Sequence, residues 1–356
     1  MPSVKSFCAV ILALLLLCSV FALPASALSL LPSVSAESAV LIEAAGGRVL
    51  YEKNARSAMP MASTTKIMTA LVALEHGDPE TTVSVDPRAV GVEGSSVYLK
   101  AGEKLTLRQL VYCLMLASAN DAAEAIAYHI SGSIEGFACL MNRKASELGL
   151  ACTHFENPHG LDGENHYTTA RELATLTAHA LKNEDFADIV STNSLEVDSD
   201  MGRHTLFNHN KLLRSYEGCI GVKTGYTQKS GRCLVSAAER DGMTLICVTL
   251  NAPDDWNDHT RLLDYGFEHF STQWLSLPYE CFYEMPVVSG ESGRLLCVTQ
   301  EAIPYPLLSG ERVTRVVECH RFVFKMPKDG EKMGRVTFYL DGVPIAVAEL
   351  TAFILN

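Results

Sequence analysis

The chain has 356 residues, 48% of them hydrophobic, and a formal net charge of −12 from 41 acidic and 29 basic residues. This composition suffices for a sizeable core and about two domains, which argues against a chain that is disordered throughout. The acidic charge is not offset by a basic run or by a stripe of interleaved aromatics, so nucleic acid is not expected as a partner.

The N-terminus has the order of a secretory signal peptide. Lys5 precedes an apolar run from Phe7 to Leu17, and Ala25-Ser26-Ala27 supplies small residues at the cleavage positions. The apolar run is too short to span a bilayer comfortably. We therefore expect an exported protein that is cleaved after Ala27, so that residues 1–27 take no part in the fold. An uncleaved membrane anchor is the alternative.

Nine of the eleven cysteines follow this segment, an odd number with no C-x-x-C pair. The pattern excludes a zinc ribbon and a small disulfide scaffold. Cys113 and Cys247 lie inside apolar runs, where a free cysteine behaves as a small hydrophobe. We expect buried thiols, although export also permits disulfides.

The segment after the signal predicts a β-hairpin followed by helices. Two short strands within residues 39–55 flank Gly46-Gly47, which predicts a two-residue turn. Apolar residues then recur at intervals of three and four in five segments, which predict helices. These segments are 63–76, 105–118, 121–132, 133–150 and 168–183. The polar stretch at 156–167, ENPHGLDGENHY, predicts a loop.

From Cys219 the pattern changes to strands. Three segments alternate apolar and polar residues, and Asp241-Gly242 joins the last two as a hairpin turn. The segments are 218–226, 232–240 and 243–251. A helical pattern follows at 258–270. Strands at both ends of this region, with helices between them, predict an α+β domain whose antiparallel sheet pairs the first hairpin with the late strands.

Beyond residue 275 the helical period is absent. Short alternating segments separated by Ser-Gly, Pro and Asp-Gly predict a small all-β domain. We thus expect a first domain at 28–272 and a second, β-sandwich-like domain at 275–356. No apolar span or long amphipathic helix follows, so we expect no C-terminal membrane anchor.

The stretch from Met61 to Gly77 places Ser63 at the start of a predicted helix, with Lys66 three residues later. Serine is a common N-cap, so Ser63 alone favours a helix cap over a nucleophile. Residues three apart share one helical face, however, so the Lys66 amine can reach the Ser63 hydroxyl. Lysine accepts that proton only if burial or other cations lower its pKa.

A second motif, Ser118-Ala119-Asn120, interrupts two helical patterns. It is compatible with a helix stop and the cap of the next helix. It is also compatible with chemistry in which Ser118 relays a proton toward a leaving group and Asn120 holds a substrate amide.

The third motif is Lys223-Thr224-Gly225, on a predicted strand. Glycine in a strand marks close approach by another backbone or a ligand, and Lys223 and Thr224 offer partners for a carboxylate. An exposed edge strand with a solubilising lysine is the alternative. Because a sheet edge can also accept a peptide as an added strand, both interpretations share one geometry.

Each motif is common alone, but the order S-x-x-K, S-x-N, K-T-G in an exported chain is specific. The sequence resembles the D-alanyl-D-alanine carboxypeptidases, the low-molecular-mass penicillin-binding proteins of peptidase family S11. The resemblance covers nearly the whole chain after the signal, including the final β domain. It implies a DD-peptidase-like fold, related to serine β-lactamases, in which a helical cluster packs on the antiparallel sheet.

The resemblance implies that Ser63 is acylated by the penultimate D-alanine carbonyl of a peptidoglycan stem peptide, releasing the terminal D-alanine. Lys66 would be the base for acylation, and Ser118 would pass the proton to the departing amine. Water would then hydrolyse the acyl-enzyme. β-Lactams would mimic the substrate, deacylate slowly and so inhibit the enzyme.

The resemblance also implies the substrate-binding residues. Asn120 would orient the substrate, and Lys223 and Thr224 of the K-T-G motif, which ends at Gly225, would bind its terminal carboxylate. The backbone N–H groups of Ser63 and Tyr226 would hold the oxyanion. Donors of that kind are worth roughly 3 to 4 kcal/mol each in the barrier.

No metal or cofactor is implied, and no protein partner is expected. The implied substrates are the peptidoglycan stem peptides. We expect His154, His159 and His166, which lack a metal-type spacing, to be surface residues. Some relatives place an arginine in the segment after the last central strand, where this chain has Asp254-Asp255-Trp256. The enzyme would act on the cell-wall side of the cytoplasmic membrane, peripherally attached.

Three alternatives remain open from the sequence. A β-lactamase would need a glutamate for deacylation, usually in an E-x-x-L-N stretch, which this chain lacks. A DD-endopeptidase would share the motifs and differ only in the leaving group. A catalytically silent wall-binding protein would not require Ser63, Lys66 and Lys223 together. Vegetative and sporulation roles both fit.

Overall fold

The computed structural model describes residues 31–290 and 293–355, so the predicted signal peptide at 1–27 lies outside the described residues. The first domain contains a five-stranded antiparallel sheet in the order β2-β1-β9-β8-β7. Its strands are β1 (Ser38–Glu43), β2 (Val49–Lys53), β7 (Cys219–Thr227), β8 (Gly231–Arg240) and β9 (Met243–Leu250). The predicted pairing of the first hairpin with the late strands is confirmed.

The two hairpin turns of this sheet differ. Asp241-Gly242 is a two-residue turn with both φ angles positive, as a type I′ turn requires, which confirms the prediction. The predicted two-residue turn at Gly46-Gly47 is wrong, because five residues separate β1 from β2. The Glu43 carboxylate accepts hydrogen bonds from the backbone N–H groups of Ala45 and Gly46, which stabilises this wider turn.

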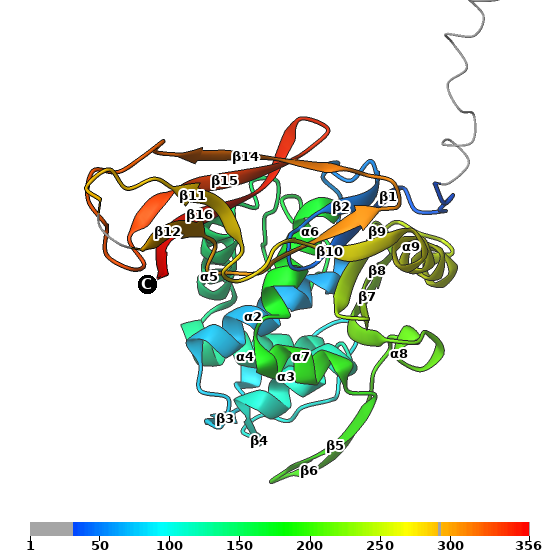
Figure 1. Ribbon diagram of the computed structural model, residues 1–356. Coiled ribbons are helices and arrows are strands. Elements are labelled where there is room, and N and C mark those ends of the chain that lie inside the picture. The colour runs from blue at the N-terminus through cyan, green and yellow to red at the C-terminus, as the bar shows by residue number, and fades with distance from the viewer. Residues whose placement is uncertain (1–30, 291–292, 356) are drawn as a thin grey trace, which may run out of the picture.

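Strand β1 is buried on both faces, which explains its unbroken apolar sequence. Val40 and Ile42 belong to the core beneath the helical cluster, whereas Ala39 and Leu41 belong to the core beneath α9 (Asp255–His269). Figure 1 shows α9 on one side of the sheet and the helical cluster on the other. The first domain therefore has three layers, with the sheet in the middle.

All the predicted helices are present, with shifted ends. Their observed bounds are α2 (Lys66–His76), α3 (Leu107–Leu116), α4 (Asn120–Ser131), α5 (Ile134–Glu147), α6 (Ala170–Ala180) and α9 (Asp255–His269). Side-chain caps set several starts. The Thr106 hydroxyl accepts from the Gln109 N–H while the Gln109 side chain accepts from the Thr106 N–H, a complete capping box for α3.

Several short elements of the first domain differ from the elements that the sequence predicts. They are η1 (Ala62–Thr65), β3 (Thr82–Ser84), η2 (Pro87–Ala89), β4 (Lys104–Thr106), α7 (Glu184–Ser191), β5 (Ser194–Ser199), β6 (Gly202–Phe207) and α8 (Leu212–Ser215). Of these, η1 matters most for the site, because it holds Ser63.

After α9 the described residues form strands only, which confirms the predicted all-β domain. The strands are β10 (Phe270–Ser276), β11 (Cys281–Met285), β12 (Arg294–Val298), β13 (Ile303–Leu308), β14 (Val313–Cys319), β15 (Lys332–Leu340) and β16 (Val343–Leu355). Five form a sheet in the order β11-β12-β16-β15-β14, and β10 pairs with β13. The exact domain limits stay a prediction.

Arg48, in the β1–β2 turn, joins the two domains. Its guanidinium forms a bidentate ion pair with Glu311, at 2.6 and 2.9 Å, and donates to the Pro306 carbonyl. The same group lies 5.2 Å from the ring centroids of Phe270 and Tyr305. Because only 12% of the Arg48 side chain is exposed, these contacts are shielded from water.

The nine cysteines of the described residues are all free. Cys113 and Cys247 are fully buried, which confirms the expectation of buried thiols for these two residues, but the expectation is wrong for Cys139, Cys152 and Cys281, which are exposed. In the part of the chain that the structure describes, helices both long and apolar enough to cross a membrane are absent.

Candidate active site

Ser63 lies in the 3-10 turn η1, immediately before α2. Neither η1 nor α2 has a side-chain cap, so the alternative role of Ser63 as a helix N-cap is not observed. Ser63 is partly exposed, whereas Ala62 and Thr64 on either side are buried. The turn therefore presents one side chain, the Ser63 hydroxyl, to the surface.

Two glycines pack tightly against this turn. A Cβ at Gly225 would lie 2.9 Å from the Ser63 backbone nitrogen, and a Cβ at Gly160 would lie 1.9 Å from the Ala62 carbonyl oxygen. Ala62 itself has φ of 47°, in the left-handed region that L-residues rarely adopt. The predicted close backbone approach at Gly225 is confirmed, and its neighbour is the Ser63 turn.

Lys66 is fully buried directly beneath Ser63. Its Nζ lies 3.0 Å from Ser63 Oγ, and it donates hydrogen bonds of 2.7 Å to Asn120 Oδ1 and to the His159 carbonyl. Burial, and secondly the charge of Lys223, lower the pKa of Lys66 well below its ordinary value. This is the condition that a lysine base needs, and the sequence could only suggest it.

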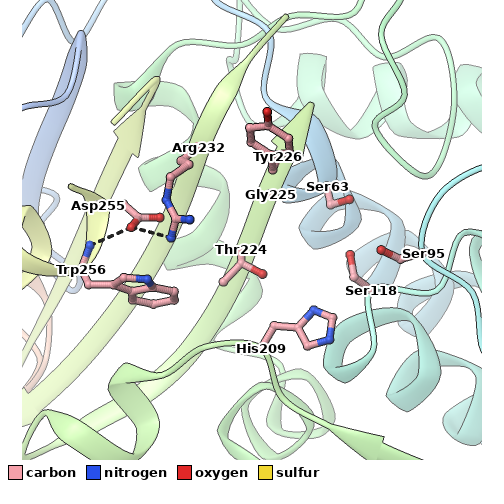
Figure 2. Close-up of a pocket in the computed structure, with 10 residues that line it drawn as sticks. All are labelled: Ser63, Ser95, Ser118, His209, Thr224, Gly225, Tyr226, Arg232, Asp255 and Trp256. Carbon is pink, nitrogen blue, oxygen red and sulfur yellow. Dashed lines mark hydrogen bonds and ion pairs between the residues drawn. The ribbon is translucent and has the colours of Figure 1, made fainter. Parts of the chain in front are cut away.

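The Ser118-Ala119-Asn120 break separates α3 from α4, as predicted. Ser118 has φ of 59° and lines the cavity beside Ser95 (Figure 2). Asn120 lies below the cavity wall, where its Oδ1 accepts from Lys66 and its Nδ2 donates 2.6 Å to the Glu93 carbonyl. The Asn120 side chain thus holds the lysine in place, and Oδ1 keeps one lone pair free.

Strand β7 is the edge of the central sheet and forms the opposite wall. Thr224, Gly225 and Tyr226 line a cavity of about 330 Å³ together with Ser63 and Ser118 (Figure 2). An edge strand offers unpaired backbone groups to an extended ligand.

Lys223 lies behind this wall, 2% exposed, and donates 3.0 Å to the Thr224 carbonyl. Burial lowers the pKa of Lys223 to about 7. The three sequence motifs thus meet around one cavity, as predicted.

The cavity has further lining residues that the sequence motifs do not include. Arg232 on β8 donates 2.8 Å to Asp255 Oδ1, which also accepts 2.9 Å from the Trp256 backbone N–H. Figure 2 shows this group beside Thr224. Arg232 and Asp255 are 23 residues apart on different elements, so no local pattern could have linked them.

His209 lines the cavity on the side of Thr224 and Ser118 (Figure 2). Asn208 and Asn210 flank it and are buried: Asn208 Oδ1 accepts from the Asn210 N–H, and Asn210 Oδ1 accepts from the Leu212 N–H. Burial, and secondly Lys223, lower the pKa of His209. Asn-x-Asn is a turn pattern that holds the middle residue outward, and this signal could have identified His209.

The expectation that His159 and His166 are surface residues is wrong. They are 7% and 4% exposed, because the loop at 156–167 folds back under η1 and α2. The Glu156 N–H donates to His166 Nδ1, so Nε2 carries the proton and donates 2.7 Å to Thr65 Oγ1. Burial lowers the pKa of His166 to about 3, and burial also lowers the pKa of His159.

His154, by contrast, is half-buried. No group of three or more His, Cys, Asp and Glu side chains in the described residues could hold a metal ion. The polar composition of the loop concealed its structural role, because its backbone carbonyls and ring nitrogens, not apolar side chains, contact the helix.

Comparison with known proteins decides the family. The family model described as D-alanyl-D-alanine carboxypeptidase, peptidase S11, matches residues 25–254. The chain belongs to the S11 D-alanyl-D-alanine carboxypeptidase family. This S11 carboxypeptidase is 34% identical over 330 residues to the D-alanyl-D-alanine carboxypeptidase DacF of Bacillus subtilis, covering 89% of this chain and 85% of that one.

Two further comparisons agree. The S11 carboxypeptidase is 31% identical over 335 residues to DacA of Escherichia coli, covering 88% and 82% of the two chains. Its fold matches penicillin-binding protein 5 from Haemophilus influenzae with a TM-score of 0.78 and 27% identity, over 92% of this chain and 99% of that one. The protein is therefore a serine-type D-Ala-D-Ala carboxypeptidase that acts on peptidoglycan, and its family binds penicillin.

Proposed function

We propose that this S11 carboxypeptidase works through an acyl-enzyme on Ser63. The observation that carries the proposal is the buried Lys66 amine, 3.0 Å from a partly exposed Ser63 hydroxyl at the cavity wall. A neutral amine has two hydrogens, which match the acceptors Asn120 Oδ1 and the His159 carbonyl. Its lone pair is then left for the Ser63 proton, as general-base catalysis requires.

The substrate would lie along β7 as an added strand. Its penultimate D-alanine carbonyl would then sit between the backbone N–H groups of Ser63 and Tyr226, which we assign as the oxyanion donors. The close packing of Gly225 on η1 keeps these two segments together. Any side chain at residue 225 would separate the two donors, so glycine at this position serves the chemistry directly.

The remaining motif residues take the following roles in this proposal. Ser118 passes the proton from Lys66 to the departing D-alanine amine, since its hydroxyl lines the same cavity. Asn120 positions Lys66 and offers its second Oδ1 lone pair to a substrate amide N–H. Water then attacks the acyl-enzyme with Lys66 again as the base, by microscopic reversibility.

The terminal carboxylate would bind at the Thr224 side of the cavity. Thr224 Oγ and Lys223 were expected from the motif, but Lys223 with a pKa of about 7 is only partly charged at neutral pH. Arg232 offers a guanidinium, which pairs with carboxylates through two parallel hydrogen bonds, and Asp255 holds it in place beside Thr224 (Figure 2). We therefore add Arg232 to the residues that hold the carboxylate.

The peptidoglycan substrate lies outside the cytoplasmic membrane, so the enzyme acts there. We propose that residues 1–27 direct export and that β-lactams inhibit by acylating Ser63. Penicillin would enter the same cavity, where its carboxylate would meet Thr224 and its lactam carbonyl the oxyanion donors. Slow deacylation would follow because the ring fragment stays attached and blocks the hydrolytic water.

Mass spectrometry of the products from a pentapeptide muropeptide tests reaction, bond and nucleophile together. Wild type should release free D-alanine, and Ser63→Ala should release none and should resist labelling by penicillin. Ser57→Ala, at an exposed serine elsewhere in the first domain, serves as the matched control and should behave as wild type. Labelled Ser63→Ala protein would overturn the nucleophile assignment. Cleavage of cross-linked dimers with little free D-alanine would favour the endopeptidase.

A further inference from the structure

An exposed apolar cluster lies at one end of the second domain. Phe322 and Phe324, in the β14–β15 connection, are 48% and 74% exposed, and Val288 in the neighbouring β11–β12 connection is 58% exposed. The two phenylalanine rings contact each other edge to face, with centroids 5.4 Å apart. In Figure 1 these two connections lie at the end of the second domain that points away from β10.

The backbone holds this cluster in place. The Val323 N–H donates 3.0 Å to the Pro286 carbonyl, and the Val288 N–H donates 2.9 Å back to the Val323 carbonyl. The Ser289 N–H also donates 3.0 Å to the Phe324 carbonyl. The two connections thus form one ordered tip, so that the rings stay exposed although burial against the domain would be favourable.

Cationic residues flank the two phenylalanines in the sequence. The nine residues from His320 to Lys328 contain Arg321, Lys325 and Lys328 and no acidic residue, in a chain whose net charge is −12. All three are exposed, and none takes part in an ion pair within the described residues.

The acidic side chains nearest in the sequence already have partners. Glu318 pairs with Arg335, Asp329 accepts from the Ile354 N–H, and Glu331 accepts from the Lys328 N–H. Within the described residues, none of the three cations of residues 320–328 therefore forms an ion pair with a carboxylate.

We propose that this tip, formed by residues 286–289 and 320–328, docks on a lipid bilayer surface that carries anionic headgroups. Aromatic side chains that enter the boundary between headgroups and acyl chains, beside lysines and arginines that reach the phosphates, are the combination that binds such surfaces. The positive charge of residues 320–328 complements the headgroup phosphates, and the exposed rings match the apolar boundary beneath them.

Hydrogen–deuterium exchange of the full chain with vesicles tests the docking. Vesicles of phosphatidylglycerol and phosphatidylcholine should protect the backbone of residues 286–289 and 320–326, whereas phosphatidylcholine alone should protect them weakly. Local protection distinguishes the tip from any binding by residues 1–30. The double variant Phe322→Ser with Phe324→Ser loses exposed apolar area. The lipid concentration needed for half-maximal protection should therefore rise about tenfold or more.

Charge and control variants complete the test. Each of Arg321→Gln and Lys325→Gln should weaken the binding about fivefold at low salt. Val343→Ser with Val347→Ser removes two exposed valines of β16, 61% and 59% exposed, and should leave the protection of the tip unchanged.

Several outcomes would overturn the proposal: no binding of the chain to anionic vesicles, binding that leaves the tip unprotected, or equal losses in the phenylalanine and valine variants. A further such outcome is that a soluble polyanion protects the same residues and that this protection persists in the double variant Phe322→Ser with Phe324→Ser. That result would show that the tip binds polyanions through charge alone and would overturn the lipid proposal.

Discussion

Lys66 is the residue on which the proposed chemistry depends. Burial lowers its pKa, so the amine is neutral above that pKa and protonated below it. The rate of acylation should therefore fall as the pH decreases through the pKa of Lys66. In Lys66→Arg the cation cannot lose its proton, so acylation by penicillin should be about 10³-fold slower and should show no such acid limb.

Stopped-flow acylation from pH 5 to 9 measures this limb. Lys182→Arg, at an exposed lysine of the same domain, should keep both the rate and the pH profile of wild type. A Lys66→Arg enzyme that retained the wild-type acid limb would assign that limb to another group.

Arg232 should contribute through the terminal carboxylate of the substrate. Losing a charge-assisted hydrogen bond costs about 1.5 to 3 kcal/mol, so Arg232→Gln should raise KM for an acyl-D-Ala-D-Ala peptide about 10- to 100-fold. The increase should be larger at pH 9 than at pH 6, because Lys223, with a pKa of about 7, loses its own charge in that interval.

The C-terminal amide of the same peptide is the control for this prediction, because it has no carboxylate. Arg232→Gln should hardly change its KM. An equal increase for acid and amide would show that Arg232 only supports the fold of the cavity wall.

The residues of the three motifs could be predicted from the sequence because each motif is contiguous. Ser63 with Lys66, and Lys223 with Thr224, share local segments whose geometry is fixed by one turn or one strand. Arg232 with Asp255 could not be predicted, since that pair depends on how β8 packs beside the start of α9.

At the scale of elements, the loop at 156–167 supports η1 from below. Its His166 is buried with a pKa of about 3, whereas an unfolded histidine has a pKa near 6.5. Below about pH 6.5 the unfolded chain therefore binds a proton that the folded chain does not bind. The free energy of unfolding falls as the pH decreases through this range. Between pH 7 and pH 5 this one group should lower the free energy of unfolding by about 2 kcal/mol.

His166→Gln removes the titrating group and keeps a donor for Thr65 and an acceptor for the Glu156 N–H. Urea titrations at pH 7 and pH 5 measure the free energy of unfolding. Its decrease between these two pH values should be about 2 kcal/mol smaller in His166→Gln than in wild type. An equal decrease in the free energy of unfolding in wild type and His166→Gln would contradict the assignment of the bound proton to His166.

The helices and the central sheet could be predicted because their apolar periodicity is strong. The long turn after β1 and the short elements from η1 to α8 could not, since they are too short to show a period and depend on particular side-chain to backbone hydrogen bonds or on pairing between strands. Glu43 widens the β1–β2 turn in this way, and the His159 carbonyl accepts from the Lys66 side chain, whereas His166 contacts η1 through the Thr65 hydroxyl.

At the scale of the whole molecule, Arg48 links the two domains. Removing one partner of a shielded ion pair costs about 3 kcal/mol or more, and Arg48→Ala also loses both ring contacts. We expect the calorimetric unfolding of the second domain to separate from that of the first, at a lower temperature. Hydrolysis of a soluble peptide should stay unchanged, since Arg48 is remote from the cavity.

Arg294→Ala is the matched control, because it breaks an exposed ion pair with Glu284 inside the second domain. Such pairs contribute little, so this variant should unfold as wild type does. A single joint transition in Arg48→Ala would show that other contacts hold the domains together.

The pairing of β1 with β9 brings together residues about two hundred positions apart, since Ala39 lies opposite Thr249. Contacts of such long range form late in folding, after most of the chain is available. The K-T-G strand β7 reaches the Ser63 turn only as part of this sheet, so a partly folded chain has no complete cavity. Covalent labelling by penicillin should therefore count only those molecules that have finished folding, which would make the antibiotic a reporter of maturation.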